Sequence, residues 1–110
     1  AALDACLPGA PIAEMERAAI EPLKKVGRED AYMVMFGTGI GVAYPPVWVG
    51  ALTINRWSEK VLEPGMVFYA HSCLQFMDEG IGILQGGTYH VTERGAEPIC
   101  GAGICDLVVV

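Results

Sequence analysis

The sequence predicts an α+β domain in which two N-terminal helices pack on one face of a mostly antiparallel sheet. Apolar residues recur at helical spacing only near the start of the chain, and from Ala31 onward short apolar or aromatic runs are bounded by glycine and proline. Helices followed by such a series of strands are typical of this class. With no internal repeat or long linker, residues 1–110 are expected to form one domain.

The two predicted helices lie on either side of a turn at 8–11. Residues 1–7 are typical of the end of a helix, and residues 12–26 have the pattern of an amphipathic helix that ends at Gly27. Pro22 lacks an amide donor and its ring crowds the preceding turn, so we expect a kink or a break near it. The predicted strands cover residues 32–36, 40–44, 66–71, 81–84, 89–92 and 107–110.

Charge and hydrophobicity limit the partners of the chain. A net charge of −6 without a basic stripe argues against nucleic acid as a partner. No apolar run reaches the roughly 20 residues of a membrane-spanning helix, so no membrane partner is expected and a cytoplasmic protein is predicted. The hydrophobic share is 53% and the charged share is only 18%, so part of the apolar surface is expected to meet another chain.

The four cysteines have neither the paired spacing of a zinc site nor the density of a disulfide scaffold. They are Cys6, Cys73, Cys100 and Cys105, and reduced thiols are the favoured interpretation. A contact between Cys100 and Cys105 remains an alternative, because the glycine-containing segment between them is typical of a loop.

The alternating glycines Gly37, Gly39 and Gly41 lack the spacing of a dinucleotide-binding loop. Glycines within a strand permit a bulge or a close approach of two backbones, and this is the structural role that we expect for them.

Three motifs carry a resemblance to a known family. They are Gly37-Thr-Gly-Ile-Gly41, Pro64-Gly-Met-Val-Phe-Tyr-Ala-His71 and Gly86-Gly-Thr-Tyr-His-Val-Thr-Glu-Arg-Gly95. The chain resembles the C-terminal half of the pita-bread family of methionine aminopeptidase, prolidase, aminopeptidase P and creatinase. In that family a cleft between two similar halves usually holds two metal ions. Pro45-Pro46-x-Trp48 and residues 106–110 are most similar to the creatinase and ectoine-hydrolase side of the family.

The resemblance also implies that the metal ligands have changed. Thr38 stands where the family has a histidine, His71 where it has a ligating glutamate, and Gly86 where it has the bridging glutamate. The family's two aspartate ligands come before the helix pair and have no counterpart in this sequence. Divalent ions need several converging carboxylates or imidazoles, so we expect no metal and no cofactor.

An altered chemistry is the alternative. His71 and Cys73 alternate on one predicted strand and therefore share a face, so the imidazole could activate the thiol as a nucleophile. We expect a buried structural cysteine instead, and the prediction leans against enzymatic activity. A hydrolase of amino-acid derivatives or peptides, using His71 and Cys73 or completed by a partner half, remains open. So does an interaction module or truncated product without activity of its own.

The expected ligand-binding residues are former ligand positions and aromatic side chains with polar edges, which suit small organic molecules or short peptides. They are Thr38, Tyr44, Trp48, Trp57, His71 and Tyr89. In the family the two halves cover each other's faces, so the resemblance implies a homodimer with a cleft at its interface, or a heteromer with a separate first half.

Overall fold

The α+β class predicted from the sequence is confirmed. The computed structural model describes residues 1–33, 36–41 and 52–99, and in these ranges the helices precede the strands. The helical elements are the 3-10 helix η1 (Leu3–Ala5), the α-helix α1 (Ala13–Lys25) and the 3-10 helix η2 (Glu29–Ala31). The strands are β1 (Gly37–Gly39), β2 (Thr53–Ile54), β3 (Val67–Phe76), β4 (Ile81–Thr92) and β5 (Gly95–Pro98).

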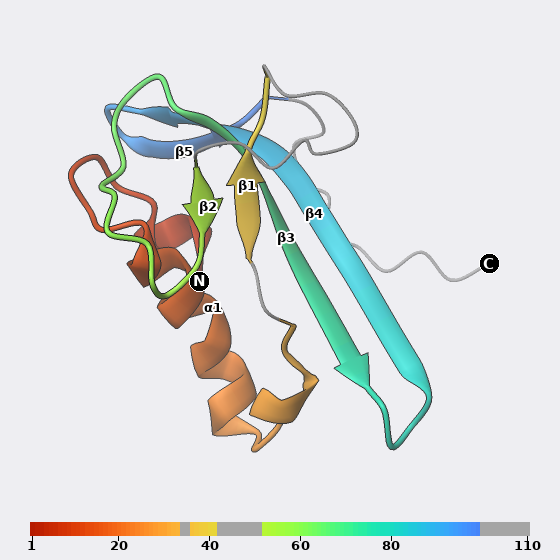
Figure 1. Cartoon of the computed structure of the whole chain (residues 1–110). Helices are drawn as coiled ribbons and strands as arrows, with labels where there is room; N and C mark the ends of the chain where they lie inside the picture. Colours follow the sequence, from red (N-terminus) through yellow and green to blue (C-terminus); the bar gives the residue numbers. More distant parts are fainter. Residues whose placement is uncertain (34–35, 42–51, 100–110) are drawn as a thin grey trace.

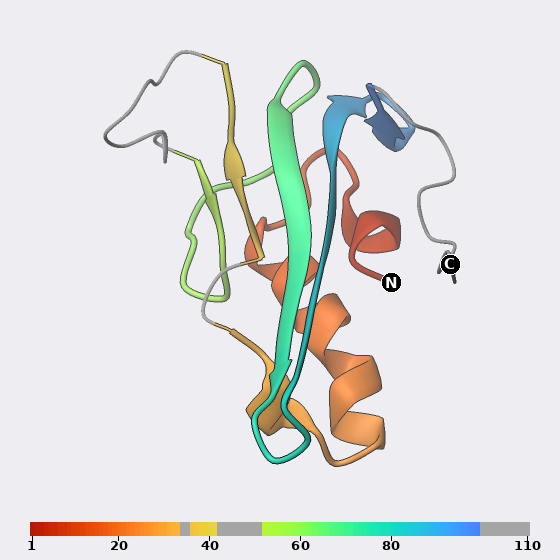
Figure 2. The same cartoon turned by 90° about the vertical axis from the view of Figure 1, so that its right-hand side faces the viewer.

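The strands form one sheet of order β2-β1-β3-β4-β5 in which every neighbouring pair is antiparallel. The helix α1 lies along one face of this sheet, and the long β3–β4 hairpin extends beside it (Figures 1 and 2). No helix in the described ranges is long and apolar enough to cross a membrane.

The helices differ in part from those predicted. Only one α-helix is present in the described residues, and the expected end of a helix at residues 1–7 appears as η1, where the amide of Ala5 contacts the carbonyls of Ala1 and Ala2. The helix α1 continues through Pro22 instead of breaking there. It ends as predicted before Gly27, whose φ of 68° gives the left-handed conformation that closes many helices.

In the described residues β3 extends beyond its predicted bounds, and the short strands β1, β2 and β5 were not predicted. Residues 81–84 and 89–92 were expected as two strands but belong to the single strand β4, because Gly86 and Gly87 stay in register with β3. In the described part of the segment expected at 32–36, Tyr32 forms an isolated bridge, and the regular strand β1 begins at Gly37. The predicted strand at 107–110 and most of that at 40–44 lie outside the described residues.

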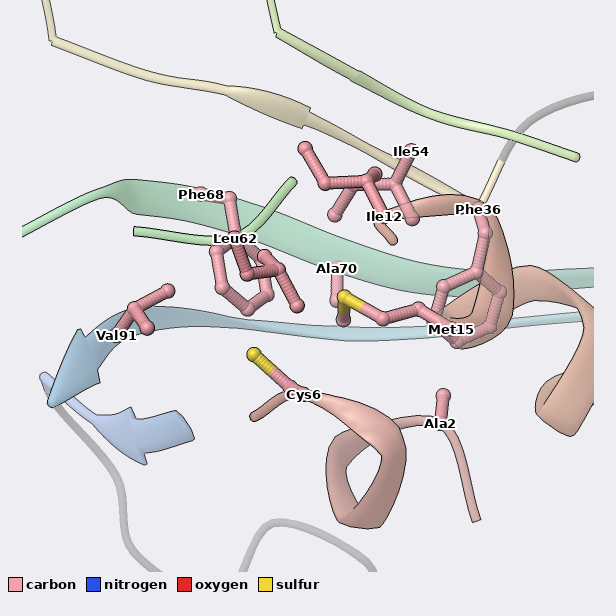
Figure 3. Packing of buried hydrophobic residues seen from close by; sticks show 10 residues of the cluster. All are labelled: Ala2, Cys6, Ile12, Met15, Phe36, Ile54, Leu62, Phe68, Ala70 and Val91. Carbon is pink, nitrogen blue, oxygen red and sulfur yellow. The ribbon is translucent and has the colours of Figure 1, made fainter. Parts of the chain in front are cut away.

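The core fills the space between the sheet and the N-terminal segment (Figure 3). Phe68 and Ala70 of β3 face Met15 of α1 and Cys6, which follows η1. The close approach expected at the glycine cluster occurs at Gly37, where an added Cβ atom would lie 2.4 Å from the backbone oxygen of Tyr69. Glycine at this position therefore lets β1 pack closely on β3.

A fully buried carboxylate joins α1 to the segment after β2. Glu16 accepts one hydrogen bond from the backbone amide of Arg56 at 2.9 Å and another from the Arg56 Nε atom at 2.6 Å. A charged group without solvent contact is tolerated only when it is paired and hydrogen-bonded. The Glu16–Arg56 pair therefore fixes the position of this segment against the helix.

A second charged contact holds the tip of the β3–β4 hairpin. Arg28, which follows α1, donates to Asp78 at 2.9 Å and to Glu79 at 2.6 Å, and its guanidinium lies 4.5 Å from the ring centroid of Phe76. Together these contacts attach the hairpin tip to the C-terminal end of the helix.

Candidate functional site

The positions at which the sequence departs from the family motifs are brought together on three adjacent strands. His71 of β3 and Gly86 of β4 are direct cross-strand partners, and Thr38 of β1 is the partner of Tyr69. Because successive side chains on a strand point to opposite faces, these residues share the face opposite to the one that carries Phe68.

The space beside Gly86 is filled by a side chain from the neighbouring strand. A Cβ atom on Gly86 would lie 2.4 Å from the Tyr69 hydroxyl oxygen and 2.8 Å from the backbone oxygen of Ala70. The phenol of Tyr69 thus lies where the side chain of a longer residue would begin. Tyr69 was not among the expected ligand-binding residues, because its position above Gly86 depends on the β3–β4 register.

His71 is a partly buried imidazole beside this phenol. Its ring centroid lies 5.7 Å from that of Tyr69, and its Nδ1 atom is buried without a hydrogen-bond partner among the described residues. Burial lowers the pKa of His71 below its usual value of 6.5, because the charged form loses solvation. The imidazole is therefore neutral at pH 7 and retains an unused polar atom.

This lowered pKa predicts a pH dependence of stability. The folded state binds the His71 proton less tightly than the unfolded state, so the contribution of His71 to stability is present above about pH 6.5 and is lost as the pH falls through the folded pKa. We expect His71→Gln to flatten the decrease in unfolding free energy between about pH 7 and pH 5, measured by urea denaturation. His90→Gln, on the neighbouring strand, is the matched control. An unchanged slope in His71→Gln contradicts the prediction.

Thr38 is held by the backbone. Its side chain is only 6% exposed, and its hydroxyl lies 3.2 Å from the carbonyl oxygen of Leu52 and 3.3 Å from that of Gly39. The hydroxyl therefore bonds within the fold, and Thr38 shapes the floor beside Tyr69.

These side chains do not fit a pair of divalent metal ions. The three changed positions supply one imidazole, one hydroxyl that is already bonded, and no side chain at Gly86. Among the residues that the structure describes, no group of three or more His, Cys, Asp or Glu side chains could hold a metal ion. The donor set thus lacks the converging carboxylates that a two-metal site requires.

The thiol of Cys73 contacts a sulfur atom instead of an imidazole. Its Sγ atom lies 3.5 Å from Sδ of Met33, and no hydrogen bond joins it to His71 in the described structure. Cys73 and Cys6 are both free thiols, as predicted. Burial raises the pKa of Cys6 to about 11, so that thiol stays protonated at neutral pH. The role of Cys73 as a nucleophile remains a prediction.

A small cavity lies next to the His71–Gly86 pair. Its volume is about 120 Å³, and most of its lining comes from the helix-facing side of the sheet. The lining residues include Leu3, Phe36, Ser72, Gln85 and Tyr89. The ring of Tyr89 also stacks on Phe68 at a centroid distance of 5.9 Å, so this tyrosine belongs to the helix-facing side.

Trp57, also among the expected residues, is not grouped with His71. Trp57 lies in a groove beside α1 with Arg17 and Ile20, and its ring is 5.5 Å from the guanidinium of Arg56. Tyr44 and Trp48 lie outside the described residues, as do Cys100 and Cys105. The predicted similarity to the creatinase side of the family depends on residues 45–48 and 106–110. These residues also lie outside the described ranges, so the similarity stays a prediction.

The α+β fold and the positions of the three motifs are those expected of the C-terminal half of a pita-bread protein. Comparison with known families identifies the family. The profile of metallopeptidase family M24 matches residues 1–110, so the chain belongs to this family. The predicted resemblance to the pita-bread enzymes is thereby confirmed. Comparison with curated proteins finds no match.

Three solved structures of similar fold are much longer than this chain. Dipeptidase PepE from Mycobacterium ulcerans is 28% identical, with a TM-score of 0.81 over 92% of this chain and 26% of its own. Prolidase from Pyrococcus furiosus is 27% identical, with a TM-score of 0.78 over 88% of this chain and 27% of its own. X-Pro aminopeptidase from Thermotoga maritima MSB8, at 20% identity and a TM-score of 0.77 over 88% of this chain and 26% of its own, shows the fold alone. The chain spans about a quarter of these relatives.

Proposed function

We propose that this M24 chain is a metal-free, noncatalytic relative of the creatinase and prolidase enzymes that binds a small molecule or short peptide. One observation carries the proposal. At the His71–Gly86 pair an imidazole and a glycine replace two glutamates of the family motifs, and the Tyr69 hydroxyl fills the space beside the glycine. A neutral imidazole and a phenol provide hydrogen-bond donors and acceptors, which suits recognition of polar or zwitterionic ligands better than activation of water.

The binding site in this proposal is completed by a second copy of the chain. The cavity of about 120 Å³ beside His71 is smaller than the roughly 300–1,000 Å³ of typical ligand sites. A second chain beside the face that carries Tyr69 and His71 extends the site into a cleft at a homodimer interface, in a cytoplasmic protein. Thr38 and His71 line the floor, and Tyr44 and Trp48 remain candidates for its walls. Tyr89, on the helix-facing side, and Trp57, beside α1, lie outside this cleft.

A second candidate function is favoured by the length of the relatives. The chain covers only 26–27% of the dipeptidase and prolidase structures, so a separate first half could supply further ligands and complete a hydrolase as a heteromer. In that case His71 and Gly86 lie beside a metal held mainly by the partner. This alternative differs from the first proposal in its dependence on metal.

Metal titration separates the two candidates. After incubation with Mn²⁺ or Zn²⁺ and dialysis, we expect far less than one bound ion per chain and no hydrolysis of X-Pro dipeptides, because the donor set lacks carboxylates. The readout is elemental analysis together with a dipeptidase assay. Stoichiometric metal with dipeptide hydrolysis by this chain overturns the proposal, and activity that appears only with an added partner supports the heteromer.

Ligand binding is tested on the same protein with a panel of dipeptides and amino-acid derivatives. We expect a ligand that binds wild type to lose roughly tenfold or more in affinity in His71→Ala or Tyr69→Phe, because each substitution removes a polar group from the site. His90→Ala serves as the control. A ligand whose affinity is equal in all four proteins binds elsewhere and contradicts the assigned site.

A further inference from the structure

The outer edge of β4 carries backbone groups without partners in the described residues. The strand β5 covers this edge only along residues 89–92, and the amide of Ile99 donates to the carbonyl of Thr88 at 3.0 Å. In an antiparallel ladder alternate residues direct both backbone groups to the same side. The carbonyl group of Thr88 points outward, away from β3. The backbone N–H and C=O groups of Gly82, Leu84 and Gly86 therefore also point outward, and they lie beyond the reach of β5.

Within the described residues this edge also lacks the features that usually protect an exposed strand. Natural edge strands are short, charged, bulged or interrupted by proline. Between Ile81 and Thr92 the sequence contains no charged residue and no proline, and residues 81–90 of β4 pair with β3 without a bulge. Ile83 and Leu84, which point to opposite faces, are 50% and 68% exposed. The edge is therefore long, regular and apolar.

The opposite edge of the sheet offers fewer backbone groups for pairing with another strand than β4 does. It is formed by β2, which contains only Thr53 and Ile54 in the described residues, and Ile54 is fully buried. A further strand can therefore extend the sheet at β4 but finds little support at β2. Figure 1 shows β4 along the side of the sheet, and among the described strands only β5 pairs with its outer edge, along residues 89–92.

We propose that β4 pairs with β4 of a second copy of this chain, antiparallel, about a two-fold axis that passes beside Leu84. This inference rests on the homodimer in the proposed function and names its interface. The axis places Leu84 opposite Leu84 of the partner subunit, and Gly82 opposite Gly86 of the partner subunit. The backbone N–H and C=O groups of all these residues point outward, so each opposed pair exchanges two backbone hydrogen bonds.

The side chains of β4 suit pairing with an identical strand. The two Leu84 side chains meet across the seam, and the glycines on either side of them leave room for this contact. On the other face Ile83 lies opposite Gln85 of the partner subunit. Self-pairing of an acidic chain usually opposes like charges, but a strand with no charged residue avoids that cost.

The symmetry of this pairing also limits its size. The described part of each chain offers one suitable edge, and an isologous contact uses the same edge of both subunits. The assembly therefore closes as a dimer with one continuous sheet and does not grow into a filament. The faces that carry Tyr69 and His71 become continuous across the seam, because both lie on the same side of the joined sheet as Leu84.

The test is a single charge at the seam. We expect wild type to have the mass of two chains in light scattering, against 11.7 kDa for one chain, and Leu84→Lys to raise the dimer dissociation constant by roughly 100-fold or more. Two lysines then oppose each other in place of two leucines. Met77→Lys is the matched control, because Met77 is an 83% exposed apolar residue in the hairpin turn, off the edge. This control is expected to remain a dimer.

Hydrogen exchange gives a second readout at single residues. In the dimer the outward amides of Leu84 and Gly86 exchange slowly, and in Leu84→Lys they exchange rapidly, while the amide of Ile83, which points toward β3, stays protected in both. Protection of Ile83 also shows that the variant is folded. A wild-type monomer at all concentrations overturns the proposal. So does a Leu84→Lys dimer of unchanged affinity, or a monomer that pairs this edge only with a strand of another protein.

The two proposals can fail separately. A β4-paired dimer that binds stoichiometric Mn²⁺ and hydrolyses dipeptides refutes the noncatalytic function but retains the interface. A monomer that binds a dipeptide through His71 retains the ligand site but refutes the interface.

Discussion

Arg56→Ala is expected to reduce the free energy of unfolding by about 3–5 kcal/mol, as is typical when one partner of a buried ion pair is removed. The substitution leaves the Glu16 carboxylate without solvent contact and without its charged partner, while the backbone amide of residue 56 still donates to it. The reverse change is less damaging, because the Arg56 side chain is 43% exposed and can reach water when Glu16 is absent. Urea denaturation at pH 7 measures the difference.

Two controls isolate the pairing from the loss of side-chain volume. Arg94→Ala removes an arginine from an exposed pair with Glu97 and is expected to cost less than about 1 kcal/mol. Adding Glu16→Gln to Arg56→Ala is expected to recover part of the loss, because the uncompensated charge is removed. If Arg56→Ala costs no more than Arg94→Ala, the buried pair does not stabilise the fold.

Gly86→Ala is the second substitution with a large expected effect, a loss of about 1–3 kcal/mol. The added methyl group collides with the Tyr69 hydroxyl and with the backbone oxygen of Ala70, so the phenol must leave its place beside His71. Thermal denaturation measures the loss. The fluorescence of Tyr69, measured against a Tyr69→Phe background, reports whether the ring has moved.

The matched control for this substitution lies on the same strand and the same face. Within one chain a Cβ atom on Gly82 meets no atom within 4 Å, so in the Leu84→Lys background, which separates the subunits, Gly82→Ala is expected to change stability by less than about 1 kcal/mol. Truncation of the phenol in Tyr69→Ala should reduce the cost of Gly86→Ala without abolishing it, because Ala70 still contacts the new methyl group. Equal losses at Gly82 and Gly86 contradict the assigned role of Tyr69.

The fold could be predicted because local patterns and family motifs agree. Helical spacing identified α1, and Gly27 marked its end, because a residue in the left-handed conformation stops a helix. The close contact at Gly37 also followed from glycine within a strand. The continuity of β4 through Gly86 could not be predicted from the sequence. Glycine weakens a strand locally, and only the pairing with β3 sustains the strand at this position.

The buried pair and the position of Tyr69 show what the sequence left undetermined. Glu16 follows Ile12 by four residues and precedes Ile20 by four, which places it on the buried stripe of α1, so an acidic residue there was a usable signal of a buried partner. Its partner Arg56 is distant in sequence and could not be inferred. Tyr69 covers Gly86 only because the register pairs His71 with that glycine, and register depends on tertiary packing.

The contact of Arg28 with the hairpin tip has a consequence for how the molecule opens. Arg28 follows α1 directly, and it holds Asp78 and Glu79 at the far end of β3 and β4. Unravelling of the last turn of the helix therefore releases the turn at residues 77–80, and fraying of that turn exposes the end of the helix. The helix end and the hairpin tip belong to one cooperative unit of local unfolding, so a protease that cuts at residues 77–80 reports on the helix as much as on the loop.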